Sequence, residues 1–143
     1  MRIQSFLLSG LALGLVACGG GGSATSGSAL TAEDAAAMSV ADLGDRLIDD
    51  SAEVADILGA IDSEADAEAA RPRLEAIVRD YQVLQERLET LDGDDLSMGD
   101  AAALMRRAPK LATNAQAVAI EIERLRTQHP EASDILGRIL DDL

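Results

Sequence analysis

An acidic loop at residues 92–95 is the first place where residue types and spacing could support metal chemistry. It reads Asp92-Gly93-Asp94-Asp95. Calcium prefers clustered carboxylate oxygens, and an EF-hand loop needs oxygen ligands at fixed positions, a glycine at the sixth and a glutamate at the twelfth. Counted from Asp92, the sixth position is Ser97 and the twelfth is Ala103. The EF-hand pattern therefore fails, and a solvated loop before a helix cap is the better interpretation.

His129 is the single histidine and could provide one ligand to a metal or a haem. The methionines beyond residue 17 are Met38, Met98 and Met105. Met38 and His129 stand near opposite ends of the chain, an arrangement that resembles the ligand pair of b-type haem bundles. Pro130 follows the histidine, however, and places it at a helix break. Tyr81 is the only aromatic residue beyond residue 17, so the usual aromatic wall of a haem pocket is missing. The sequence disfavours haem, and we expect no cofactor.

Patterns that support catalysis are also lacking. A single histidine at a helix end and no Gly-x-Ser-x-Gly sequence give no basis for a serine nucleophile. Adjacent acids occur at Asp49-Asp50, Asp94-Asp95 and Asp141-Asp142. We interpret them as solvated helix faces, because no polar pocket is implied around them. An enzyme is therefore not expected.

Composition excludes further classes of function. The formal net charge is −14, which repels phosphate, so nucleic acid is not an expected partner. One cysteine cannot form an internal disulfide, and one histidine cannot form a multi-histidine zinc site. The alternative that stays open is a bundle binding a small ligand or cation, with a site among Asp92, Asp94, Asp95 and His129 or between the helices.

The elements that would position these residues are all predicted to be helices. Apolar residues recur at helical spacing over residues 40–61, 64–91, 98–128 and 130–142, with a short extra turn at 32–38. Long helices joined by short loops become antiparallel neighbours. We therefore predict an all-α fold: an up-down bundle of three long helices plus a short C-terminal helix.

Helix starts and buried faces follow from the same pattern. Ser or Thr precedes Asp by three residues at Thr31/Asp34, Ser39/Asp42, Ser63/Asp66 and Ser97/Asp100. Such pairs cap a first turn, although Glu is the more usual acid. The expected apolar stripes are Val40, Leu43, Leu47, Val54, Ile57 and Ile61; then Leu74, Ile77, Tyr81, Leu84, Leu88 and Leu91; then Leu104, Ala108, Leu111, Ala115, Val118, Ile122 and Leu125. The first stripe is interrupted at Asp50-Ser51, and Pro109 is expected to kink the third long helix.

The amino terminus contains the most specific motif of the chain. Arg2 precedes an apolar stretch that is too short to span a membrane comfortably and suits a secretory signal. Leu15-Val16-Ala17-Cys18 resembles the lipobox of bacterial lipoproteins. That resemblance implies cleavage before Cys18 and acylation of its sulfur. Gly19 after the cysteine favours the outer membrane over the inner one within this family.

The expected organisation follows from this motif. Residues 1–17 form a lipoprotein signal peptide, residues 18–30 an acylated cysteine with a Gly/Ser linker, and residues 31–143 an acidic helical domain. We expect a lipid-anchored protein on the periplasmic face of the outer membrane. Its expected role is structural or protein-interacting, with an envelope protein or a second copy as partner.

Overall fold

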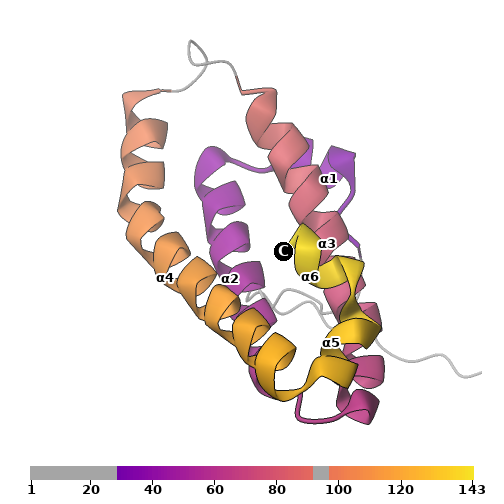
Figure 1. Ribbon diagram of the computed structural model, residues 1–143. Coiled ribbons are helices and arrows are strands. Elements are labelled where there is room, and N and C mark those ends of the chain that lie inside the picture. Colours follow the sequence, from indigo (N-terminus) through magenta and orange to yellow (C-terminus); the bar gives the residue numbers. More distant parts are fainter. Residues whose placement is uncertain (1–28, 92–96) are drawn as a thin grey trace, which may run out of the picture.

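The computed structural model describes residues 29–91 and 97–143, and within them all regular structure is helical (Figure 1). The helices are α1 (Ala32–Ala37), α2 (Val40–Gly59), α3 (Glu64–Glu89), α4 (Met98–Gln128), α5 (Pro130–Leu136) and α6 (Arg138–Asp142). The predicted all-α class is confirmed, and the three long helices begin at the predicted residues.

Hydroxyl caps begin the first four helices as the sequence predicts. Thr31, Ser39, Ser63 and Ser97 each accept a hydrogen bond from the backbone N–H of the Asp three residues later. In α1, α2 and α4 that Asp also accepts from the cap residue's own N–H, which completes the capping box. These bonds satisfy amides that the helix leaves unpaired, so Asp serves here in the place of the more usual Glu.

Helix α2 lies between the other two long helices (Figure 1). Helix α4 packs mainly on α2 and on α5, whereas α3 packs on α1, α2, α5 and α6. The two short C-terminal helices therefore fold back onto α3. The core runs through this part of the molecule, and its largest fully buried side chains include Leu58, Leu74, Ile77 and Leu125.

The buried face of α2 differs from its predicted stripe. Ile48 and Leu58 are buried, whereas the predicted Leu47 and Ile57 are only half-buried. The reason is that α2 contacts neighbours on two sides, so its buried surface is broader than a single stripe. Asp50 and Ser51, which were expected to interrupt the stripe, are buried as well.

Helix α4 buries less of its predicted stripe than expected. Val118 and Leu125 are buried, but Leu104 and Leu111 are half-buried and Ala108 is exposed. Only the C-terminal half of the stripe reaches the core that α3 and α5 share. The N-terminal half of α4 thus rests on α2 alone among the long helices.

The predicted C-terminal helix is divided at a glycine, whereas the kink expected at Pro109 stays a prediction. Pro72 and Pro109 lie inside α3 and α4, and both helices continue through them as single elements. The predicted C-terminal helix over residues 130–142 is instead divided at Gly137, whose φ of 38° ends α5. A positive φ suits glycine because it has no Cβ, and α6 starts directly after it.

Candidate functional site

The sequence singled out Cys18, Asp92, Asp94, Asp95 and His129, and of these the structure describes only His129. Cys18, Asp92, Asp94 and Asp95 lie outside the described residues. His129 caps the C-terminus of α4, and its Nε2 lies 3.8 Å from Asp62 Oδ1. Within residues 29–91 and 97–143, no group of three or more His, Cys, Asp or Glu side chains is arranged to hold a metal ion.

The methionines do not converge on His129 either. Met38 caps the C-terminus of α1, and Met98 begins α4 with 92% of its surface exposed. Helix α1 packs on α3, while His129 joins α4 to α5 at the other end of the bundle (Figure 1).

A buried ionic cluster joins α2, α3 and the segment before α1. Asp50 on α2 and Asp80 on α3 are each only 2% exposed. Arg46 bridges them: its Nε donates to Asp50 Oδ2 at 3.0 Å, and its Nη2 donates to Asp80 Oδ2 at 2.7 Å. The backbone N–H of Leu30 donates to the other oxygen, Asp80 Oδ1, at 2.9 Å. We call Arg46, Asp50 and Asp80 the Arg46 cluster.

The Arg46 cluster contains two carboxylates and one guanidinium, so with all three groups ionised its net charge is negative. Burial raises the pKa of Asp50 above its ordinary value of 3.8, against the opposing effect of Arg46. Burial of a charge is costly unless a partner and hydrogen bonds compensate it. In this cluster one cation pairs with two buried anions, so the favourable pairing only narrowly offsets the cost of burying the charges.

Neutral hydrogen bonds extend the polar region towards α4. Asn114 Nδ2 donates to the carbonyl of Ile48 and to Ser51 Oγ, both at 2.9 Å. Ser51 Oγ in turn donates to the same Ile48 carbonyl at 2.9 Å. Burial, followed by the charge of Asp50, raises the pKa of Tyr81 to about 12, so this phenol stays protonated. The polar groups thus link α2 to both of its long neighbours.

The sequence contains a signal for the Arg46 cluster besides its apolar stripes. Arg46 and Asp50 stand four residues apart, a spacing that places them on the same helix face. Asp80 stands between Ile77 and Leu84, next to Tyr81, and therefore on the buried side of its helix. The interpretation of Asp49-Asp50 as a solvated pair was wrong for Asp50, because Arg46 and Asp80 allow its burial.

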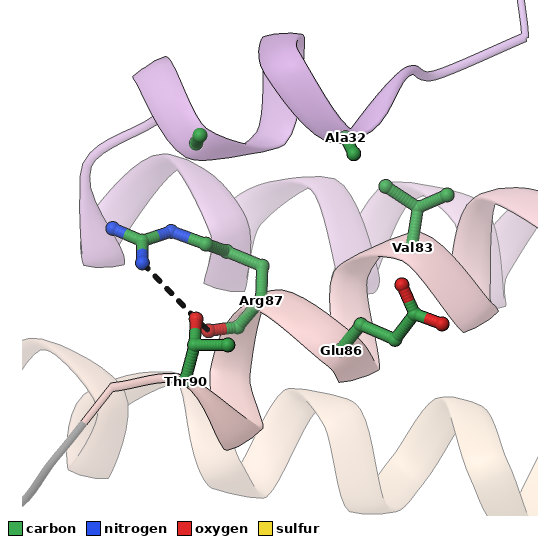
Figure 2. A pocket seen from close by; sticks show the side chains of 6 residues that line it. Ala32, Val83, Glu86, Arg87 and Thr90 are labelled. Carbon is green, nitrogen blue, oxygen red and sulfur yellow. Dashed lines mark hydrogen bonds between the residues drawn. The ribbon is translucent and has the colours of Figure 1, made fainter.

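A hollow of about 240 Å³ lies between α1 and the end of α3 (Figure 2). Its lining residues are Ala32, Ala36, Val83, Glu86, Arg87 and Thr90. Arg87 Nη1 donates to Thr90 Oγ1 at 3.2 Å, and Arg87 Nε is buried without an acceptor among the described residues. The remaining lining is mainly small and apolar, so the hollow is a gap under the short α1 rather than a site with converging polar groups.

The most unusual surface feature lies on α4. All three exposed large apolar side chains of the described residues belong to this helix: Met98 is 92% exposed, Met105 79% and Ile120 59%. Scattered single apolar residues are ordinary on protein surfaces, but a group confined to one helix marks a candidate contact surface.

Comparisons with protein-family models, with curated proteins and with solved structures find no match. Among the helices described here, none combines the length and the apolar character that crossing a bilayer requires.

Proposed function

We propose that this protein is a lipid-anchored protein-interaction module of the bacterial cell envelope. Cys18 is the proposed site of lipidation, and the periplasmic face of the outer membrane is the proposed location. The helical domain would be held near the bilayer and bind a partner through its surface. No catalytic role is part of the proposal.

The anchor is supported by the Leu15-Val16-Ala17-Cys18 motif directly after an apolar stretch, and by the Gly/Ser-rich residues that follow it. One diacylglycerol with a further acyl group would give stable anchoring, because each buried CH₂ contributes about 0.8 kcal/mol.

The interaction role is supported by one observation above all, the confinement of exposed Met98, Met105 and Ile120 to α4. Every other large apolar side chain of the described residues is at least partly buried, and this contrast supports a contact surface on α4.

The anchor is tested with Cys18→Ser in cells grown with radiolabelled palmitate. We expect the parent to incorporate label and to pellet with membranes, and the variant to lose both properties. If the Cys18→Ser protein still fractionates with membranes, the anchor proposal is wrong.

The interaction role is tested by a photo-reactive amino acid placed at residue 105, with the exposed position 82 on α3 as the matched control. We expect a discrete crosslinked species in intact cells from residue 105 and none from residue 82. Equal or absent crosslinking at the two positions would remove the support for an interaction module.

A further inference from the structure

The outer face of α4 carries an uncharged line that extends along most of the helix. Its members recur every three or four residues, as helical periodicity requires for one face. They are Met98, Ala102, Met105, Pro109, Ala112, Gln116 and Ile120. All seven are exposed, whereas Ala103, Val118 and Leu125 on the opposite side of α4 are buried. We call this line the outer face of α4.

Charge around the middle of the outer face is opposite to that of the chain as a whole, while Asp100 and Glu123 stand at its two ends. Residues 101–120 contain Arg106, Arg107 and Lys110 and no acidic residue, although the chain has a formal net charge of −14. Arg107 turns inward, where its Nε and Nη2 donate to the two carboxylate oxygens of Asp45 at 2.7 and 2.6 Å. Arg106 and Lys110 are exposed beside the uncharged line.

The placement of the amino-terminal segment separates this face from the point where the linker joins the domain. Leu30 is bonded to Asp80 of α3, and α1 packs on α3. Helix α4 lies beyond α2, at the opposite edge of the bundle (Figure 1). The outer face of α4 is therefore directed away from the side of the domain where the amino-terminal segment joins it.

We propose that the outer face of α4 binds an amphipathic helix of another protein, one whose apolar stripe is flanked by Asp and Glu. This proposal rests on the proposed interaction role and adds the surface and the chemistry of the partner. An apolar line with three- and four-residue spacing is the surface that receives a helix in helix–helix recognition.

Charge selects among the occupants of such a surface. Acidic flanks on the incoming helix would face Arg106 and Lys110, whereas basic flanks would be repelled by them. A second copy that pairs the two outer faces is disfavoured because it would bring Arg106 and Lys110 of one chain against the same cations of the other. The anchoring bilayer is disfavoured because the linker joins the domain at α3, on the other side of α2.

The test uses the full chain from Cys18 onward, with Cys18→Ser, and ¹³C-methyl labelling of methionine. Met98 and Met105 report on the outer face, and Met38 at the end of α1 is an internal control. The probes are three synthetic helical peptides that share one leucine stripe and differ only in flanks of Glu, Lys or Gln. We expect the Glu-flanked peptide to shift the Met98 and Met105 signals while Met38 stays unchanged.

The expected preference is at least about tenfold tighter binding of the Glu-flanked than of the Lys-flanked peptide, which corresponds to about 1.4 kcal/mol. Met105→Glu/Ile120→Glu should weaken binding by at least about tenfold. Arg106→Glu/Lys110→Glu should reverse the preference between the two peptides. Gln82→Glu, at an exposed position of α3, is the matched control and should change neither result.

Other results would overturn the proposal. Tighter binding of the Lys-flanked peptide, or shifts confined to Met38, would place the recognition elsewhere. Broadening of the Met98 and Met105 signals with protein concentration alone would assign the face to a second copy, and shifts caused only by phosphatidylglycerol vesicles would assign it to a bilayer. If residue 105 crosslinks in cells but none of the three peptides binds, the interaction role stands and the acidic-helix partner is refuted.

Discussion

Helices α3 and α4 have similar apolar periodicity but very different surroundings. The shorter α3, with 26 residues, buries Leu74, Ile77, Val78 and Leu84 together with Asp80, whereas α4, with 31 residues, buries only Ala103, Val118 and Leu125. Helix α3 is covered by α1, α2, α5 and α6, while α4 rests mainly on α2 and α5. Periodicity therefore indicates which side of a helix turns inward, but the number of neighbours decides how much of that side is buried.

The largest predicted change in stability is at the Arg46 cluster, where α2 packs on the well-covered α3. Arg46→Met should lower the free energy of unfolding by about 3–5 kcal/mol, because two buried carboxylates lose their common cation. Urea unfolding followed by circular dichroism measures this change. The triple variant Arg46→Met/Asp50→Asn/Asp80→Asn should recover part of the loss, since no buried charge remains. A loss below about 1 kcal/mol in the single variant would place the cluster among weak surface pairs.

Matched leucine truncations compare the two helices directly. Leu74→Ala on α3 should cost about 2–5 kcal/mol, because a fully buried leucine leaves a cavity. Leu111→Ala on α4 should cost clearly less, because that side chain is half-buried and water can enter the space. The same unfolding measurement serves both variants. Equal losses would mean that the N-terminal half of α4 contributes as much to the core as α3 does.

The two carboxylates of the Arg46 cluster should differ when each is neutralised. Burial raises the pKa of Asp50 above 3.8, so the folded state binds this proton more tightly than the unfolded state does. The contribution of Asp50 to the free energy of unfolding is therefore complete below pH 3.8. It declines as the pH rises through the raised pKa of Asp50 in the folded state. Asp50→Asn removes this decline, so its stability relative to the parent should increase from acidic to neutral pH.

Asp80→Asn is the control for that pH series. Asp80 accepts from both Arg46 and Leu30, and an amide has one oxygen to accept where the carboxylate has two. We expect Asp80→Asn to be less stable than Asp50→Asn at neutral pH, as judged by thermal unfolding. If Asp50→Asn is the less stable variant and its loss of stability relative to the parent grows with pH, Asp80 is not the carboxylate on which the cluster depends more strongly.

The smallest effects are expected at the outer face of α4. Met105→Gln and Ile120→Gln should each change the free energy of unfolding by no more than about 0.5 kcal/mol, because these side chains are already in water. Their effect should appear in peptide binding instead. Destabilisation by more than about 1 kcal/mol would show that the exposed line contributes to the fold rather than to recognition.

Much of the fold could be predicted from the sequence because its determinants are local. The pairs Ser39/Asp42 and Ser97/Asp100 mark the starts of α2 and α4 to the residue, since a cap needs only neighbours three positions apart. Gly137 was missed because its positive φ depends on how α5 and α6 fold back onto α3.

The candidate site could be predicted less well, because its determinants are distant in sequence. Asp50 is buried beside Arg46 of its own helix, and Arg46 also pairs with Asp80 of α3, 34 positions away in the sequence. The pattern of each helix indicates the Arg46–Asp50 pair and the inward side of Asp80, but it does not show that the two helices bring Arg46 and Asp80 together. The exposed Met105 was missed for the same reason, because exposure of α4 depends on which helices fail to cover it.

The bond between Leu30 and Asp80 also has a mechanical consequence. Any pull on the chain from upstream of residue 29 reaches this bond first, because Leu30 is the first described residue that is tied to a distant helix. The next element under load is the six-residue α1, which is held to α3. We therefore expect tension to detach α1 from α3 before it unfolds α2, so that the long helices stay packed while the short one is lost.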